Sequence, residues 1–299
     1  MVAEAYTGRF APSPTGPLHF GSLVSALASF LDARAHHGRW LLRIEDLDPP
    51  REMPGAAARI ARQLEMHGLH WDGEILYQSR RGTQYREALR RLAASGLLFL
   101  CDCSRERLHR LGRNYDGACR HRVLADPGPG DSRFSIRIRT GDAPAIHFTD
   151  CLLGKTARTN LDDAGGDFVL RRRDGLFAYQ LAVAVDDAAQ NITHVVRGYD
   201  LLESTPRQIF LLRELGMPVP TYGHVPVVLD ACGRKLSKQN HAAELDGEQA
   251  ADNLYRALTW LGQNPPSTAA GASVTELLNW ASQHWSPQAV WQGKTPFIT

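Results

Sequence analysis

The sequence predicts an α/β protein with a parallel sheet and crossover helices, on three observations. Short apolar strand patterns alternate with helical patterns in the first 100 residues, and the alternation returns after residue 176. The chain has 299 residues, enough to bury a core without disulfides. Hydrophobic residues make up 43% and charged residues 22%, which is typical of a globular protein and excludes a disordered one.

Residues 1–100 carry the first half of this pattern. A short strand at 6–10 ends in a Pro/Gly-rich turn, and a helix follows whose apolar residues recur at helical spacing until Gly38. The remaining expected elements of this half are a strand at 40–44, helices at 54–67 and 85–94, and a strand at 97–100.

The rest of the chain divides into three further parts. Residues 101–175 read as an insertion of mixed structure, with alternating strands expected at 134–139, 146–153 and 168–172. Residues 176–240 resume the α/β rhythm, with strands expected at 192–197 and 224–229 and a helix at 201–215. Residues 241–299 are expected to be a helical segment, with a flexible connection at 265–273 and no assignment for the tail from 280 onward.

Composition also bounds the cellular setting. No apolar run approaches the roughly 20 residues of a membrane span, and the N-terminus lacks a basic region followed by an apolar stretch. We therefore expect a cytoplasmic protein with no membrane partner. The net charge of +2 does not by itself indicate a polyanion partner, and five cysteines, an odd number, favour reduced thiols or a metal site over disulfides.

The first motif with chemical meaning lies between the first strand and the first helix. Residues 9–22 read RFAPSPTGPLHFGS, which places His19 and Gly21 where the helix begins. A helix N-terminus favours phosphate, a glycine lets a nucleotide approach the backbone, and a histidine can donate to phosphate oxygens. Taken alone, the pattern is also compatible with a tight turn and a solvated histidine.

A second motif follows a late strand. Lys235 and Lys238 flank Ser237, just after a turn at Gly233. Two ammonium groups on a mobile loop can hold the phosphates of ATP as they separate. Alone, this segment is equally an exposed basic turn.

Together the two motifs resemble the signatures of class I aminoacyl-tRNA synthetases, and further segments resemble the glutamyl-tRNA synthetase catalytic domain. These segments are RFAPSPTG at 9–16, RIEDLD at 43–48, VDD at 185–187 and VRGYD at 196–200. Ser22 stands where the class pattern has a second histidine. The glutamyl subclass often lacks that histidine. The resemblance implies a Rossmann-like, doubly wound parallel sheet.

Only 61 residues follow Lys238, too few for the anticodon-binding region of a full glutamyl-tRNA synthetase. The shortened chain resembles the glutamyl-Q tRNA(Asp) synthetase family. That resemblance implies activation of L-glutamate with ATP and Mg²⁺, transfer of glutamate to queuosine at the wobble position of tRNA(Asp), and a monomer. Two alternatives stay open: a glutamyl-tRNA synthetase fragment that charges a tRNA 3′ end, and a non-catalytic tRNA-binding paralogue.

The same resemblance assigns site residues. It implies catalytic roles for His19, Lys235 and Lys238, and ATP binding by His19, Gly21 and Lys238. The arginines suit the two carboxylates of glutamate, Glu45 suits its ammonium group, and Tyr179 would orient it by hydrogen bonding. The full glutamate-binding set is Arg9, Phe10, Ala11, Pro12, Ser13, Glu45, Tyr179 and Arg197.

A cysteine cluster predicts a metal site in the insertion. Cys101, Cys103 and Cys119 lie within 19 residues, and three thiolates suit a structural Zn²⁺, one per chain, that needs a fourth ligand. By chemistry alone His109 or His121 would be named first, whereas the family resemblance favours Tyr115. Residues 105–122 also carry a local charge of +4, which would suit tRNA phosphates or a solvated face.

Overall fold

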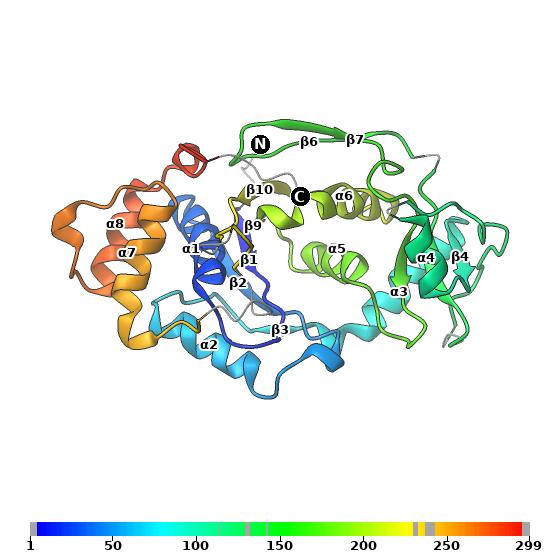
Figure 1. Cartoon of the computed structure of the whole chain (residues 1–299), viewed down its shortest axis with the longest axis horizontal. Coiled ribbons are helices and arrows are strands. Elements are labelled where there is room, and N and C mark those ends of the chain that lie inside the picture. Colours follow the sequence, from blue (N-terminus) through cyan, green and yellow to red (C-terminus); the bar gives the residue numbers. More distant parts are fainter. Residues whose placement is uncertain are drawn as a thin grey trace.

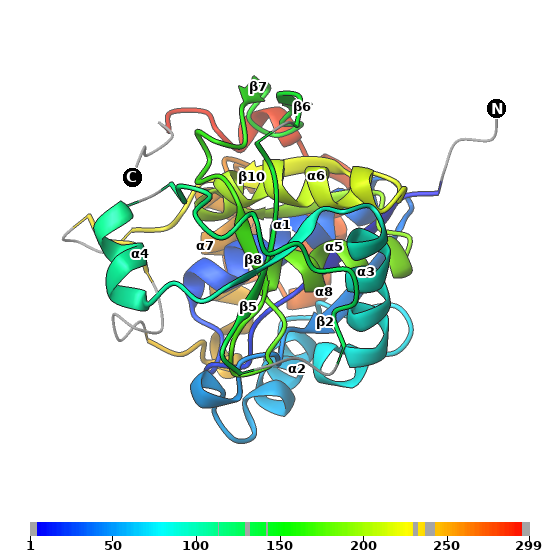
Figure 2. The same ribbon diagram turned by 90° about the vertical axis from the view of Figure 1, so that its right-hand side faces the viewer.

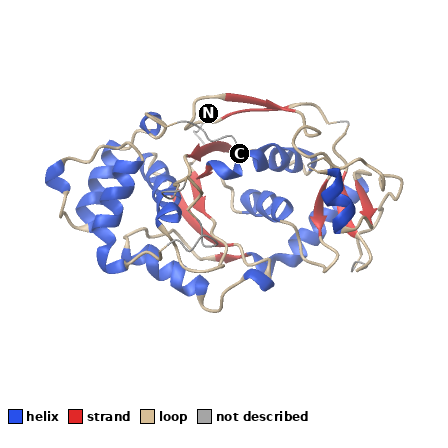
Figure 3. Cartoon of the chain, in the orientation of Figure 1, coloured by secondary structure: helices blue, strands red, loops and turns tan. Residues whose placement is uncertain are grey.

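The computed structural model describes residues 5–112, 114–128, 132–141, 143–229, 233–236 and 243–294. Two parallel sheets form its centre (Figures 1 and 3). The first consists of β1 (Thr7–Phe10), β2 (Arg39–Ile44) and β3 (Leu76–Tyr77), and the second of β9 (His194–Gly198) and β10 (Thr221–Val225). They meet where the Thr193 N–H donates to the Thr7 carbonyl at 2.9 Å, beside β1 and β9. From this junction the strands are added in opposite directions, β2 and β3 on one side and β10 on the other. The junction is therefore a topological switch point, where open α/β sheets bind ligands.

Helices cover both faces of the parallel strands (Figure 1). One core joins the β1–β3 strands to α1, α7 and α8, and a second core holds α3, α5 and α6. The helix bounds are α1 (Phe20–Ala35), α2 (Ala56–Met66), α3 (Gly82–Ala94), α4 (Arg105–Leu111), α5 (Tyr179–Ala189), α6 (Thr205–Glu214), α7 (Ala250–Trp260) and α8 (Val274–His284). Within the described residues, no helix is long and apolar enough to cross a membrane.

The middle of the chain forms antiparallel structure. Strands β4 (Leu98–Cys101), β5 (Ser135–Ile138) and β8 (Phe168–Arg171) make one sheet, in the order β4-β5-β8. Strands β6 (Ile146–Thr149) and β7 (Thr156–Thr159) form a hairpin that passes over β10 and α6 (Figures 1 and 2). Asp150, the residue after β6, bridges to Tyr222 in β10, so the hairpin reaches back to the parallel strands.

The strand expected at 97–100 forms, but the expectation that it continues the parallel sheet is wrong. It pairs antiparallel with β5, whose alternating residues bury Ile136 and Ile138. The helix before it, α3, ends at Ala94, and Gly96, two residues later, has a positive φ of 70° and redirects the chain. Local periodicity identified the strand, and long-range pairing decided its sheet.

Smaller shifts occur in the second half. The strand expected at 224–229 is β10 (Thr221–Val225), which ends before Pro226, a residue with no N–H for a sheet. The helix expected from 201 begins as α6 at Thr205, with Pro206 in its first turn, after a 3₁₀ helix at Tyr199–Ser204. The connection expected to be flexible at 265–273 contains a 3₁₀ turn, Ser267–Ala269.

Candidate active site

A cavity of about 460 Å³ opens at the carboxyl ends of the parallel strands, where β1 and β9 meet. Every sequence-predicted catalytic, ATP-binding or glutamate-binding residue that the structure describes lines it. These are Arg9, Phe10, Ala11, Pro12, Ser13, His19, Gly21, Glu45, Tyr179, Arg197 and Lys235. Lys238 lies outside the described residues. The structure thus brings segments from five regions of the chain to one cavity.

Arg9 is held from behind by a buried ion-pair network. Its Nε lies 3.1 Å from Asp187 Oδ1, and the same oxygen accepts from Arg43 Nη2 at 2.6 Å. All three side chains are at most 4% exposed. Burial acts to raise the pKa of Asp187, but the attraction of Arg43 and Arg9 outweighs it and holds that pKa below its usual value. Asp187 Oδ2 also accepts from Arg9 Nη2 at 3.4 Å, so Asp187 occupies the Nε–Nη2 edge of the Arg9 guanidinium.

Glu45 follows β2 and lies beside the same network. Its Oε1 is 3.8 Å from Arg43 Nε, and its side chain is 9% exposed. Burial raises the pKa of Glu45 to about 7, although Arg43 and Arg9 oppose the shift. The neighbouring Tyr179, first residue of α5, has its pKa raised by burial as well. An ammonium group entering the cavity would favour the ionised form of Glu45.

Arg197, near the end of β9, also lines the cavity. Its guanidinium donates to Gln208 Oε1 at 2.8 Å, Thr205 Oγ1 at 2.9 Å and His224 Nε2 at 3.3 Å. Its Cζ also lies 5.4 Å from the centre of the Tyr222 ring. The side chain is therefore fixed before any ligand binds, which lowers the entropy lost on binding.

The start of α1 brings a helix N-terminus to the cavity. His19 is the N-cap residue, and its Nδ1 accepts from the Ser22 N–H at 3.3 Å. The neutral ring therefore carries its hydrogen on Nε2, the atom that can donate to a phosphate oxygen. The Cβ of any other residue at position 21 would lie 3.2 Å from the His19 ring. Glycine therefore allows the ring to keep its position.

Lys235 also lines the cavity. Its Nζ is 2.6 Å from Asp200 Oδ2, in a partly exposed ion pair. The Leu236 N–H donates to the Val228 carbonyl at 2.8 Å and closes the turn that carries the lysine. An exposed pair of this kind is weak, so a phosphate can compete for the ammonium group.

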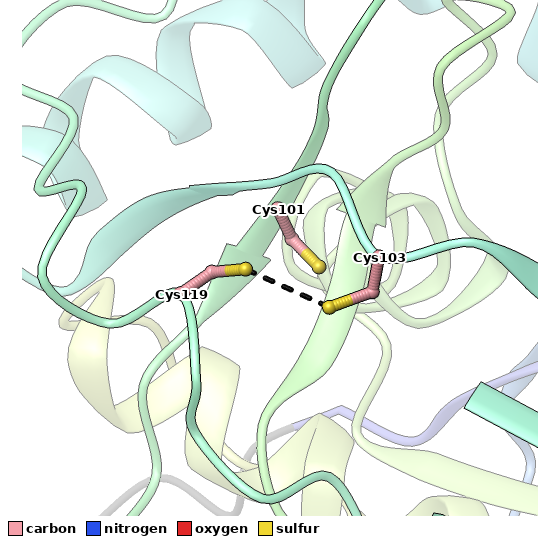
Figure 4. Close-up of side chains that lie close together, drawn as sticks. All are labelled: Cys101, Cys103 and Cys119. Carbon is pink, nitrogen blue, oxygen red and sulfur yellow. Dashed lines mark hydrogen bonds between the residues drawn. The ribbon is translucent and has the colours of Figure 1, made fainter. Parts of the chain in front are cut away.

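A second cluster lies in the antiparallel part of the chain. The Sγ atoms of Cys101, Cys103 and Cys119 all lie within 4.8 Å of one another, and those of Cys103 and Cys119 are 3.6 Å apart (Figure 4). The Tyr115 hydroxyl is 3.7 Å from both Cys101 Sγ and Cys103 Sγ. His121 is exposed and its Nδ1 contacts the Ala118 carbonyl instead. Three thiolates with one oxygen form a donor set that suits Zn²⁺.

Residues 6–261 match the family model described as tRNA synthetases class I (E and Q), catalytic domain. The chain belongs to this family. It is therefore an enzyme of the ligase type, an aminoacyl transferase, and the cavity at the switch point is the candidate active site of this synthetase.

Curated relatives match the synthetase over nearly their whole length. A protein of Thiobacillus denitrificans is 53% identical over 95% of both chains, and one of Ectopseudomonas mendocina is 50% identical over 97% of both. Both relatives are named glutamyl-Q tRNA(Asp) synthetase. Among solved structures, glutamate-tRNA synthetase from Elizabethkingia anophelis superposes with a TM-score of 0.79 at 25% identity, covering 99% of this chain and 68% of that one. The fold is thus the class I synthetase fold.

Sequence reasoning gave no role to the residues that hold the arginines in place. Arg43 lies in the RIEDLD segment and Asp187 in the VDD segment, so the sequence did contain a signal for these two residues. Asp150, His224 and Gln208 had no local signal. They contact the site only because the hairpin after β6, strand β10 and helix α6 meet there.

Proposed function

We propose that this synthetase activates L-glutamate with ATP and Mg²⁺ and transfers the glutamyl group to queuosine at the wobble position of tRNA(Asp). The names of the curated relatives support the acceptor, and their match over at least 95% of both chains supports the same overall reaction. The charge pattern of the cavity supports the amino acid.

The observation that carries glutamate is the set of charged groups that line the cavity. Two guanidinium groups, those of Arg9 and Arg197, lie there with the carboxyl group of Glu45. The guanidinium groups suit the two carboxylates of glutamate, and Glu45 suits its ammonium group. Glutamine has an amide in place of the side-chain carboxylate, so it would leave a buried guanidinium without a counter-charge.

The proposed first step is attack of a glutamate carboxylate oxygen on the α-phosphorus of ATP, which breaks the bond to pyrophosphate. An ionised carboxylate needs no general base, so the protein positions the reactants and stabilises charge. His19 Nε2 and the N-terminus of α1 would hold phosphate oxygens. Lys235, with Lys238 by family resemblance, would hold the departing phosphates, and Mg²⁺ would come with ATP as substrate.

In the second step a hydroxyl of the acceptor attacks the mixed anhydride and releases AMP. The test supplies purified protein, ATP, Mg²⁺ and labelled glutamate to tRNA from cells that make queuosine and from cells that cannot. We expect label only on the queuosine-containing pool, in the anticodon fragment after nuclease digestion. Prior periodate oxidation of the queuosine diol should block it. Equal labelling of both pools at the 3′ end would establish ordinary tRNA charging instead.

Pyrophosphate exchange separates the remaining alternative. We expect glutamate-dependent, tRNA-independent exchange that is lost in Lys238→Ala and not supported by glutamine. No exchange and no label from the wild-type protein would leave the non-catalytic tRNA-binding paralogue as the explanation.

We further propose one structural Zn²⁺ held by Cys101, Cys103, Cys119 and Tyr115. The three Sγ atoms already lie within 4.8 Å of one another, and the Tyr115 oxygen lies against two of them. The zinc would connect the end of β4 to the segment that contains Cys119. It would be structural, and the reaction would take place in the cavity at the switch point. We also propose that the chain has three parts. They are a catalytic domain (1–100 and 176–240), a zinc-bearing insertion (101–175) and a helical C-terminal segment (241–299).

Metal analysis tests this site. We expect one zinc per chain in the wild-type protein, loss of zinc and a lower melting temperature in Cys103→Ser, and weaker zinc retention against a chelator in Tyr115→Phe. His121→Ala is the matched control and should retain zinc like the wild type. If His121→Ala weakens zinc retention and Tyr115→Phe does not, the fourth zinc ligand is His121 instead of Tyr115.

A further inference from the structure

Asp150 is a buried carboxylate that the proposed chemistry does not use. It follows β6, in the turn that joins β6 to β7, and is 2% exposed. Its Oδ1 accepts from the backbone N–H groups of Leu152 and Leu153 at 3.0 and 2.9 Å, which shapes the turn. Its Oδ2 lies 2.7 Å from His224 Nδ1, on strand β10. Oδ1 also accepts from the His224 backbone N–H at 3.2 Å, so Asp150 joins the turn to both the backbone and the ring of His224.

This contact determines which nitrogen of His224 carries hydrogen. A carboxylate oxygen only accepts, so Nδ1 must be the donor. His224 is fully buried, and burial lowers its pKa, although Asp150 opposes that shift. The neutral ring then keeps a lone pair on Nε2, which faces two donors: Arg197 Nε at 3.3 Å and Thr205 Oγ1 at 3.2 Å.

The lone pair on Nε2 completes a set of acceptors around Arg197. Gln208 Oε1 accepts from Nη1 at 2.8 Å, while Thr205 Oγ1 and the Leu201 carbonyl accept from Nη2 at 2.9 and 3.3 Å. If His224 carried its hydrogen on Nε2, that N–H group and the Nε–H group of Arg197 would point at each other. The guanidinium would have to turn or leave a buried donor unpaired.

We propose that Asp150 and His224 form a positioning relay that fixes the direction of the Arg197 guanidinium in the glutamate-binding cavity. Through this relay the turn between β6 and β7, where Asp150 lies 47 residues before Arg197 in the chain, sets the affinity for the amino acid. The inference rests on the proposed function, because it takes glutamate as the ligand of Arg197. Neither Asp150 nor His224 lines the cavity, so they act through the arginine.

Asp150→Asn tests the relay with almost no change of shape. The asparagine carbonyl can keep the turn, while its amide offers an N–H to His224 Nδ1 and so shifts the ring hydrogen to Nε2. We expect the KM for glutamate in pyrophosphate exchange to rise tenfold or more, with the KM for ATP unchanged. Asp32→Asn is the matched control. Asp32 is also a buried carboxylate and accepts from Tyr6 Oη and Trp285 Nε1, but neither it nor its two partners line the cavity. It should lower stability without changing the KM for glutamate.

A pair of substitutions at His224 separates the two halves of the relay. Asparagine can replace Nδ1 as a donor to Asp150 but offers nothing at the Nε2 position. Glutamine can place its carbonyl oxygen near the Nε2 position and accept from Arg197. We expect His224→Asn to raise the KM for glutamate at least tenfold and His224→Gln to raise it much less.

Nitrogen NMR of the histidine side chains gives a readout that does not depend on activity. We expect the signal that disappears in His224→Asn to be a neutral ring with hydrogen on Nδ1, and to move to the other tautomer in Asp150→Asn. A wild-type ring with hydrogen on Nε2 would overturn the relay, as would an unchanged KM for glutamate in a folded Asp150→Asn protein. Absence of exchange in the wild type would instead overturn the proposed function, and the NMR result would still decide the hydrogen-bonding arrangement.

Discussion

Glu45 shows most directly how the fold changes the chemistry of one residue. A carboxylate in water ionises far below neutral pH, but burial raises the pKa of Glu45 to about 7. Arg43, with Nε 3.8 Å away, limits the shift and does not cancel it. The site therefore holds a carboxyl group that is near half ionisation at neutral pH. A bound ammonium group would complete that ionisation.

The first prediction follows from this titration. Below pH 7 the ionised fraction of Glu45 falls about tenfold per pH unit, so the KM for glutamate should rise by nearly that factor between pH 6.5 and 5.5. Above pH 7.5 it should level off, while the KM for ATP stays flat. Pyrophosphate exchange across this range measures both. In Glu45→Gln the KM for glutamate should be high and lose its dependence on pH in this range; a retained slope would assign the titration to another group.

At the scale of elements, the start of α1 is the part of the fold that prepares the site for phosphate. The helix begins directly after the turn from β1, so its N-terminus lies where the strands end. His19 caps the helix through Nδ1 and presents Nε2 to the cavity side. Gly21 lies in the first turn, where a Cβ would be 3.2 and 3.3 Å from two atoms of the His19 ring.

Gly21→Ala should therefore separate stability from activity. Alanine is the better helix former by about 1 kcal/mol, so thermal stability should hold or rise. The added methyl displaces the His19 ring, and we expect the kcat of pyrophosphate exchange to fall about tenfold, which is about 1.4 kcal/mol of transition-state stabilisation. Gly82→Ala at the start of α3 is the matched control, because its Cβ would meet only Arg86 Nη1 at 3.4 Å and Phe177 at 3.8 Å. A wild-type rate in Gly21→Ala would remove the positional argument for His19.

At the scale of the whole molecule, the C-terminal segment is part of the support of the catalytic fold. Leu254, Leu258 and Leu261 are fully buried in the core that also contains α1. Beyond α8, the indole N–H of Trp285 donates to Asp32 at 2.9 Å and that of Trp291 donates to the His224 carbonyl at 2.8 Å. The segment thus joins α1 to strand β10.

Two matched substitutions test this support. Trp285→Phe and Trp291→Phe each remove one indole hydrogen bond, and each should lower the free energy of unfolding by about 1 kcal/mol, measured by denaturant titration. Trp291 also stacks edge-on against Tyr199 and holds His224, so only its substitution should raise the KM for glutamate, by a few-fold. If neither variant is destabilised, the segment does not brace the fold.

The sequence by itself determined the α/β class, most element positions and the motif residues that line the cavity. Arg9 and Arg197 lie near the ends of strands, Glu45 follows a strand and His19 caps a helix, and local periodicity indicates such places well. Their chemical roles stay predictions. Lys238, which the same motifs single out, lies outside the described residues.

Only the tertiary structure decided which partners hold those residues. Arg9 meets Asp187 across 178 positions of sequence, and His224 meets Asp150 across 74. It also decided that β4 joins an antiparallel sheet and that the tryptophan-containing tail returns to α1 and β10. The physical reason is that periodicity reflects only the neighbours within a turn or along a strand. A buried charge instead needs whichever partner the packing of distant elements brings within hydrogen-bond distance.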